Sequence, residues 1–199
     1  MYALEKGRKK IIRLIQSKIV SQSQQNEVII EEIQRPSIEN IDEEFLKAVS
    51  EADINKMDLL LDEKSVDGTI LVNVNAVNKN GDTALIIASE NGNLDVINLL
   101  FEYNIDLTFK DANGNNALIR AAEHGCFDVV EELLRKKINI NLVNNNKRTA
   151  LMMAAENGHI RVVKLLIKKG AKITIKDNFD KTALDIVKSK IKKLKKYNQ

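Results

Sequence analysis

The sequence has 199 residues, with 31 Lys and Arg against 28 Asp and Glu and 44% apolar residues, which is enough for one or two folded domains. Aromatic residues make up only 4%, Trp is absent and there is a single proline, so a β-sandwich or barrel is disfavoured and an all-α fold is expected. The sequence lacks the apolar runs that a membrane span or a secretory signal requires, and the single cysteine, Cys126, excludes an internal disulfide. We therefore expect a reducing, cytoplasmic environment.

Charge is distributed unevenly along the chain, although the net charge is only +3. Residues 1–26 carry six bases and one acid, residues 27–67 carry thirteen acids and four bases, and residues 186–199 carry six lysines and no acid. The middle of the chain is nearly neutral. An electrostatic partner is therefore expected only at the ends.

Residues 1–40 are the least regular part of the sequence. Residues 5–15 align with residues 156–166, which form the back half of a 33-residue repeat. This segment is either a partial repeat, as at a truncated N-terminus, or an independent amphipathic helix. Pro36 and Ser37 mark a break before the next unit.

Residues 41–80 resemble a divergent copy of the same repeat. The apolar pattern of Phe45–Ala48, followed by Ala52, lies 40 residues before Leu85–Ala88 and Gly92. The seven extra residues fall at about 64–71. We expect a repeat with a lengthened loop; the alternative is a flanking irregular helix.

A period of 33 residues organises the remaining chain. The segment Gly81–Leu85 recurs as Gly114–Leu118, Lys147–Leu151 and Asp180–Leu184. In the units 81–113, 114–146 and 147–179, a turn glycine and then pairs of Val or Ile and Leu follow this segment. The pattern predicts two antiparallel helices per unit, with a positive φ at the glycines and a cap on the first helix from Thr83 or Thr149. The turn glycines are Gly92, Gly125 and Gly158.

These residues resemble the ankyrin repeat, whose units stack as helix pairs with projecting hairpin loops. The resemblance implies an ankyrin-repeat solenoid that binds a partner protein through its loop tips and first helices. Two departures stand out. The Pro and His of the family motif are missing from all four copies, so the hydrogen bonds that this histidine supplies between loops must be absent or replaced. The left-handed glycine after the second helix is kept only at Gly170, whereas Asn104, which tolerates that conformation, and Lys137, at a cost of roughly 1 kcal/mol, hold the equivalent places.

Residues 180–199 keep a first helix but lack the turn glycine, because Ile191 replaces it. We expect one helix running toward Lys196 that caps the stack with an apolar stripe and a lysine-rich outer face. The lysines have three interpretations: they keep the end of the array soluble, they form a nuclear import signal at Lys192–Lys195, or they bind anionic lipid or nucleic acid. The stripe comprises Ile186, Val187, Ile191 and Leu194.

Enzymatic motifs are missing from the sequence: it has no glycine-rich phosphate loop, no Gly-x-Ser-x-Gly elbow and no paired His or Cys ligands. We therefore expect no catalytic residue, no cofactor and no metal. Cys126 and His159 share one repeat position beside a turn glycine, where a structural role is favoured.

The family resemblance marks the positions beside the loop glycine and before the turn glycine as the partner-binding surface. The set is rich in Asn and Lys, so a polar epitope or a partner of modest affinity is expected, with Arg148 and Phe179 as the best anchors and as neighbours on one ridge. The candidates are Lys79, Asp82, Glu90, Lys110, Asn113, Asn115, His124, Asn146, Arg148, Asn178, Phe179 and Lys181.

The leading interpretation is a monomeric, non-enzymatic interaction scaffold for an unknown protein. The first alternative is a fragment of a longer ankyrin protein without an activity of its own. The second is a protein that binds an anionic membrane or nucleic acid through its basic C-terminus. Nuclear import and signal-less export stay open as locations.

Overall fold

Antiparallel helix pairs make up most of the computed structural model, which describes residues 41–63 and 70–197, with side chains up to Lys192. The chain divides into two units between Arg35 and Pro36, and all described residues belong to the second unit. The partial repeat expected in residues 1–40 and most of the lengthened loop at about 64–71 lie outside the described residues.

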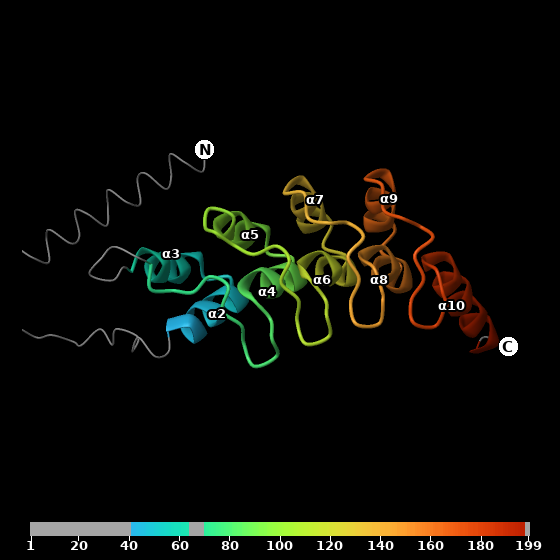
Figure 1. Ribbon diagram of the computed structural model, residues 1–199, viewed down its shortest axis with the longest axis horizontal. Coiled ribbons are helices and arrows are strands. Elements are labelled where there is room, and N and C mark those ends of the chain that lie inside the picture. Colours follow the sequence, from blue (N-terminus) through green and yellow to red (C-terminus); the bar gives the residue numbers. More distant parts are fainter. Residues whose placement is uncertain (1–40, 64–69, 198–199) are drawn as a thin grey trace, which may run out of the picture. The chain divides into compact units, whose positions relative to one another are not determined.

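The first helices of successive units pack side by side in one row, and a second helix packs on each of the first four (Figure 1). The row consists of α2 (Ile41–Glu51), α4 (Ala84–Asn91), α6 (Ala117–His124), α8 (Ala150–Asn157) and α10 (Ala183–Tyr197). The second helices are α3 (Ile54–Asp62), α5 (Leu94–Leu100), α7 (Phe127–Arg135) and α9 (Ile160–Lys168). The predicted all-α repeat architecture is confirmed. Loops between units project on the side of the row opposite the second helices (Figure 1).

Polar caps and turn residues set the helix bounds, as the sequence predicts. The side chains of Thr83 and Thr149 accept hydrogen bonds from the backbone of Ile86 and Met152, and Asn116 caps α6 in the same way. The turn glycines Gly92, Gly125 and Gly158 have φ of 72°, 74° and 78°. Ala52 occupies the equivalent place between α2 and α3 with φ 55°.

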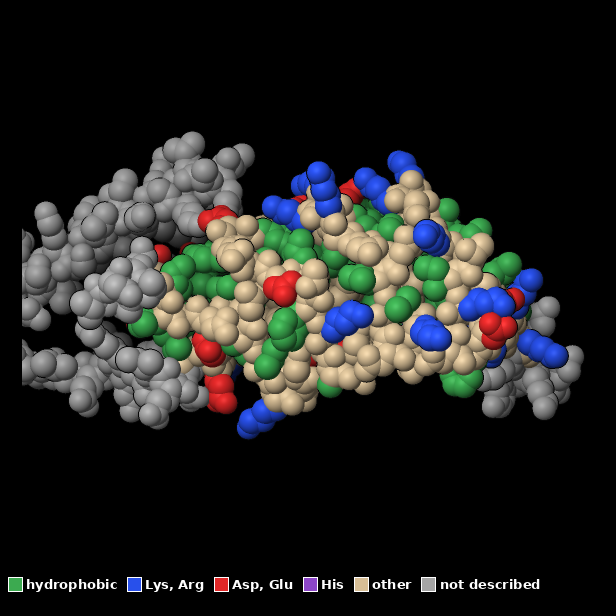
Figure 2. Space-filling model, viewed as in Figure 1, with side chains coloured by type: hydrophobic (Ala, Val, Ile, Leu, Met, Phe, Trp, Pro, Cys, Tyr) green, Lys and Arg blue, Asp and Glu red, His purple; other side chains and the backbone are tan. Residues whose placement is uncertain are grey.

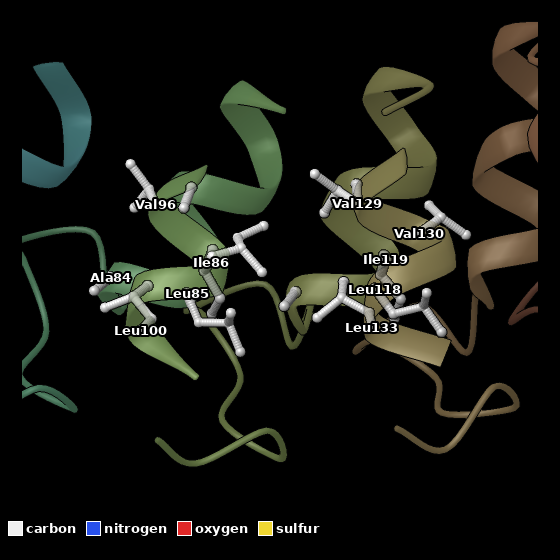
Figure 3. Close-up of a cluster of buried hydrophobic side chains, with 14 of the residues drawn as sticks. Ala84, Leu85, Ile86, Val96, Leu100, Leu118, Ile119, Val129, Val130 and Leu133 are labelled. Carbon is white, nitrogen blue, oxygen red and sulfur yellow. The ribbon is translucent and has the colours of Figure 1, made fainter. Parts of the chain in front are cut away.

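Apolar side chains from both helices of each unit form a continuous core (Figure 3). Leu85 and Ile86 of α4 and Val96 and Leu100 of α5 are all at most 1% exposed. The small residues predicted to allow close helix approach are also buried, among them Ala88, Ala121 and Ala154 at 0%. Because each unit buries its apolar face on the next, stacking supplies the core.

A left-handed residue was expected after each of three second helices, and the structure has it at two of these places. Gly170 and Lys137 have φ of 89° and 63°. Asn104 does not have a positive φ, so its expected left-handed conformation was wrong. The physical reason is that α5 ends at Leu100, two residues earlier in the register than α7 and α9, and the chain then leaves through a different turn.

The C-terminal helix α10 packs on α8, and Ala183 and Ile186 are its buried apolar residues. Val187 is half-buried, but Ile191 is 48% exposed, so its expected place in the buried stripe was wrong. The reason is that the described residues include no second helix to cover that side of α10. The side chain of Leu194 lies outside the described residues.

Candidate functional site

One Asn or Asp side chain holds each projecting loop in shape. Asp111 Oδ1 accepts hydrogen bonds from the backbone N–H groups of Asn113 and Asn115, both at 2.8 Å. Asn78, Asn144 and Asp177 make the same two bonds at the same repeat position. Sequence reasoning missed this feature, although the 33-residue spacing of these four residues signalled it.

Neighbouring loops are also bonded to one another. The Asn145 N–H donates to the Asn113 carbonyl at 3.1 Å, and Asn144 Nδ2 donates to Asn115 Oδ1 at 2.8 Å. Further along, the Asn178 N–H donates to the Asn146 carbonyl at 3.0 Å. Asparagine amides and backbone groups therefore replace the loop-to-loop bonds of the missing histidine, so the loops at 111–115, 144–148 and 177–181 form one bonded edge, which we call the loop edge.

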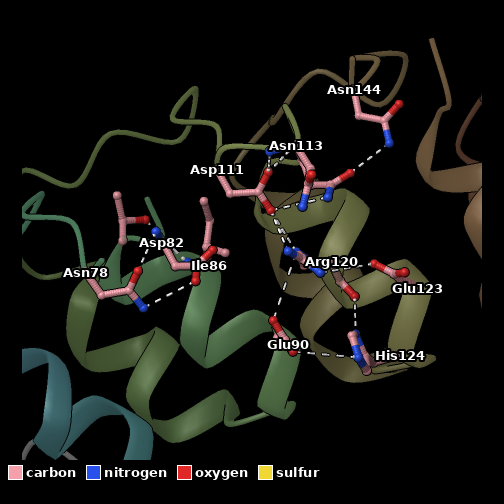
Figure 4. A network of polar contacts seen from close by, with 12 residues as sticks. Asn78, Asp82, Ile86, Glu90, Asp111, Asn113, Arg120, Glu123, His124 and Asn144 are labelled. Atoms are coloured by element: carbon pink, nitrogen blue, oxygen red, sulfur yellow. Dashed lines mark hydrogen bonds and ion pairs between the residues drawn. The ribbon is translucent and has the colours of Figure 1, made fainter. Parts of the chain in front are cut away.

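Arg120 of α6 is the centre of a charge network between two units (Figure 4). Its Nη2 lies 2.7 Å from Asp111 Oδ2, its Nη1 lies 3.5 Å from Glu123 Oε2, and its Nε lies 4.0 Å from Glu90 Oε2. Burial, the largest single influence, lowers the pKa of the guanidinium, but the hydrogen bond to Asp111 and the charges of Asp111, Glu90 and Glu123 together raise the pKa of Arg120 above its ordinary value. Sequence reasoning did not single out Arg120.

Arg148 takes a comparable role one unit later, starting from a loop instead of a helix. Its Nη1 contacts Glu156 Oε2 and its Nε lies 3.5 Å from Asp177 Oδ2. Asp177 shapes the following loop, so Arg148 joins the loop at the start of its unit to the loop at its end. The carboxylates Glu90, Glu123 and Glu156 repeat at one helix position, and an arginine contacts each of them.

Ten of the twelve predicted contact residues are exposed or half-buried. Asp82 and Asn115 are only 8% and 5% exposed, so the exposure expected for them was wrong. The reason is the loop geometry: Asn78 Nδ2 donates to Asp82 Oδ2, and Asn144 Nδ2 donates to Asn115 Oδ1. The other ten are Lys79, Glu90, Lys110, Asn113, His124, Asn146, Arg148, Asn178, Phe179 and Lys181.

Two hollows lie along this loop surface. The larger, of about 440 Å³, lies between the last described loop and α10, and brings Arg148 and Phe179 together as expected. Its other lining residues are Glu156, Lys181, Ile186, Ser189 and Lys190. The smaller, of about 270 Å³, brings Asn113, Asn146 and Arg148 together with Arg120 and Glu123. Phe179 is 72% exposed, whereas Ile186, the other large apolar side chain that lines the larger hollow, is buried.

Cys126 and His159 both reach back to a backbone carbonyl of the preceding unit. Cys126 Sγ lies 3.6 Å from the Glu90 oxygen, and His159 Nε2 lies 2.9 Å from the Glu123 oxygen. Burial, with a further contribution from the Glu90 charge, raises the pKa of the Cys126 thiol, which lowers the fraction present as reactive thiolate at neutral pH. Both side chains therefore have the structural role that the sequence favours.

His124, the remaining histidine, lies 3.8 Å from Glu90 Oε1 at the border of the Arg120 network (Figure 4). Across the described residues, we find no cluster of three or more His, Cys, Asp or Glu side chains arranged for a metal. The same part of the chain contains no helix with the length and apolar character that crossing a membrane needs.

Comparison with known proteins identifies a family whose model matches this chain. The family model described as Ankyrin repeats (3 copies) matches residues 45–144 and again 105–177. Repeats of this kind are generally protein–protein interaction modules and are typically non-enzymatic. A search of curated proteins found no match. The two matches together span more than half of the chain, its helix pairs stack as such repeats do, and the chain belongs to the ankyrin repeat family.

Proposed function

We propose that this chain is a non-enzymatic scaffold that binds a partner protein along its loop tips and first helices. The observation that carries the proposal is the hollow of about 440 Å³ that joins Arg148 and Phe179. An exposed aromatic side chain beside a paired arginine is the composition from which interface hot spots are made. The bonded loop edge presents these groups on a rigid frame, which lowers the entropy lost on binding.

The chemistry of the surface specifies the partner further. The first helices present the carboxylates of Glu90, Glu123 and Glu156, which pair with Arg120 or Arg148, and the loop tips are rich in Asn and Lys. We propose a partner with a polar epitope and an apolar side chain that packs against Phe179. The chain acts as a monomer in this proposal, and the half-buried Cys126 thiol fits a reducing compartment such as the cytoplasm.

Phe179→Ala is the sharpest test, because this change leaves the loop intact. The Phe179 backbone N–H bonds Asp177 at 2.9 Å, and alanine keeps that bond. We expect the partner that the intact chain captures from a cell extract to be lost with Phe179→Ala and kept with Leu59→Ala, a control residue 57% exposed on α3. Retention of every captured protein by Phe179→Ala would contradict the proposal.

A second pair of variants separates this surface from the basic C-terminus. We expect Arg148→Ala combined with Phe179→Ala to abolish binding, and Lys192→Ala combined with Lys195→Ala to leave it intact at physiological salt. Because Arg148 pairs with the buried Asp177, the melting temperature of the first variant is measured alongside. Loss from the lysine variant alone would favour a membrane or nucleic acid instead.

A further inference from the structure

Five large apolar side chains are exposed at the C-terminal end of the described array, away from the loop edge. We call them the terminal apolar face. They are Ile160 and Ile167 of α9, Ile173 of the following loop, and Leu184 and Ile191 of α10. In the preceding units, the positions of Ile160 and Ile167 are held by Phe127 and Leu134 and by Leu94 and Phe101, which are all half-buried.

Leu184 shows what the face lacks. Its equivalents Leu85, Leu118 and Leu151 are 1%, 1% and 3% exposed, whereas Leu184 is 61% exposed. Each buried leucine belongs to a first helix that packs on the second helix of its own unit and also on the first helix of the next unit. Among the described helices, α10 has neither of these two neighbours. A helix is therefore what covers this position elsewhere in the array.

The second helices give the same indication. Helix α7 packs on α5, and α9 packs on α7, so each helix covers the apolar side of the one before it. In the described part of the chain, α9 has no such successor. The terminal apolar face thus consists of one exposed side of α9 and one exposed side of α10. A single further helix would bury both.

Charge defines the chemistry of that helix. Residues 160–192 contain ten Lys and Arg against three Asp. Of the three, Asp177 is buried and Asp185 accepts hydrogen bonds from Thr182, while Lys164, Lys168, Lys188 and Lys192 are exposed on α9 and α10. Apolar and basic side chains lie next to one another over α9 and α10 (Figure 2). An occupant with acidic flanks would match this border.

We propose that the terminal apolar face binds an amphipathic helix of a partner protein, with an apolar stripe against α9 and α10 and Asp or Glu on both flanks. The bound helix takes the place beside α10 that a second helix takes in the preceding units. None of the five residues of this face lines the hollow of about 440 Å³ that carries the proposed function, so the two proposals are independent.

The test uses the full chain and two fluorescent peptides of about 18 residues, long enough to form a helix. Both carry leucines at helical spacing, and the remaining positions are Glu in one peptide and Lys in the other. We expect saturable binding of the Glu peptide, weakened by salt, and about tenfold weaker binding after Leu184→Gln combined with Ile167→Gln. Leu59→Gln, at an equally exposed leucine on α3, is the matched control and leaves binding unchanged.

Circular dichroism melting confirms that the double variant is folded, since both substituted side chains are largely exposed. Equal binding to the double variant, or equal binding of the two peptides, would overturn the proposal. Two other outcomes would also overturn it. In the first, the unaltered chain does not bind the Glu peptide but binds phosphatidylserine vesicles, and the double variant loses the vesicle binding. In the second, the unaltered chain associates with itself and the double variant does not.

Discussion

Single residues with positive φ show where this array departs from a regular one. Lys147 and Asp180 have φ of 56° and 62° at the loop position that Gly81 and Gly114 hold in earlier units. Lys137 has φ 63° at the position of Gly170. A side chain in this region costs about 1 kcal/mol or more relative to glycine. The sequence register predicted the strain at Lys137, and the same register at Lys147 and Asp180 could have predicted theirs.

Lys137→Gly is expected to stabilise the protein by about 0.5–1 kcal/mol, because glycine adopts this backbone conformation without a Cβ penalty. The measurement is the midpoint of urea unfolding. Lys169→Gly is the matched control: Lys169 ends α9 with φ −87°, so glycine there gains nothing and lowers the midpoint. A lower midpoint for Lys137→Gly would contradict the assignment of strain to this residue.

Gly125→Ala and Gly158→Ala compare two turn glycines with nearly the same φ, 74° and 78°. A Cβ at Gly125 would lie 2.5 Å from His159 Nδ1, whereas a Cβ at Gly158 would meet nothing within 4 Å. We expect Gly158→Ala to cost about 1 kcal/mol from backbone strain and Gly125→Ala to cost about 1–3 kcal/mol more from the overlap. Equal losses in unfolding free energy would show that His159 yields freely.

At the scale of elements, the loops depend on one carboxylate or amide each. Asp111 accepts two backbone N–H bonds and also pairs with Arg120. We expect Asp111→Ala to destabilise by about 3 kcal/mol or more, because it leaves two backbone N–H donors without their acceptor and removes the nearest carboxylate partner of the half-buried Arg120 guanidinium. Asp111→Asn keeps the accepting oxygen, so it is expected to lose less than half as much in thermal unfolding. An equal or larger loss for Asp111→Asn would show that the ion pair with Arg120 dominates and that the loop bonds contribute little.

The helix pairs and turns were predictable because a local rule decides each of them. Thr83 caps the start of α4 and Gly92 forms the turn at its end, both through contacts within a few residues. The spacing of apolar residues such as Leu85 and Val96 marks the buried helix faces. The site was less predictable, because contacts between successive loops, which are distant in the sequence, decide it. The burial of Asn115 depends on Asn144, and the pairing of Arg148 depends on Asp177, each about one repeat away. Such partners are invisible until the stacking is known.

At the scale of the whole molecule, stability in a stacked array is close to a sum over units and the interfaces between neighbours. The described helices contact mainly their own unit and the next, so unfolding is expected to begin at an end. Among the described helices, α10 covers the C-terminal end by packing on α8; its Ala183 and Ile186 are buried, and Lys190 Nζ donates a hydrogen bond to the Glu156 carbonyl. This helix is therefore the element on which the stability of the last complete unit depends.

Deleting residues 183–199 is expected to remove that cover and to expose the apolar side of α8, including Leu151 and Met153, which are 3% and 8% exposed in the intact chain. Hydrogen exchange is the measurement that resolves where the loss occurs. Amides of α8 and α9 are expected to exchange about tenfold faster or more, while those of α4 and α5 stay nearly unchanged, because the effect of one interface decays along a nearest-neighbour array. Light scattering should also detect aggregation through the uncovered surface.

A uniform increase in exchange across all helices would indicate one cooperative block instead of a stack that frays. Unchanged exchange in α8 with a monomeric truncated chain would show that α10 lies on the array without stabilising it, and that the Lys-rich helix serves only as a tail.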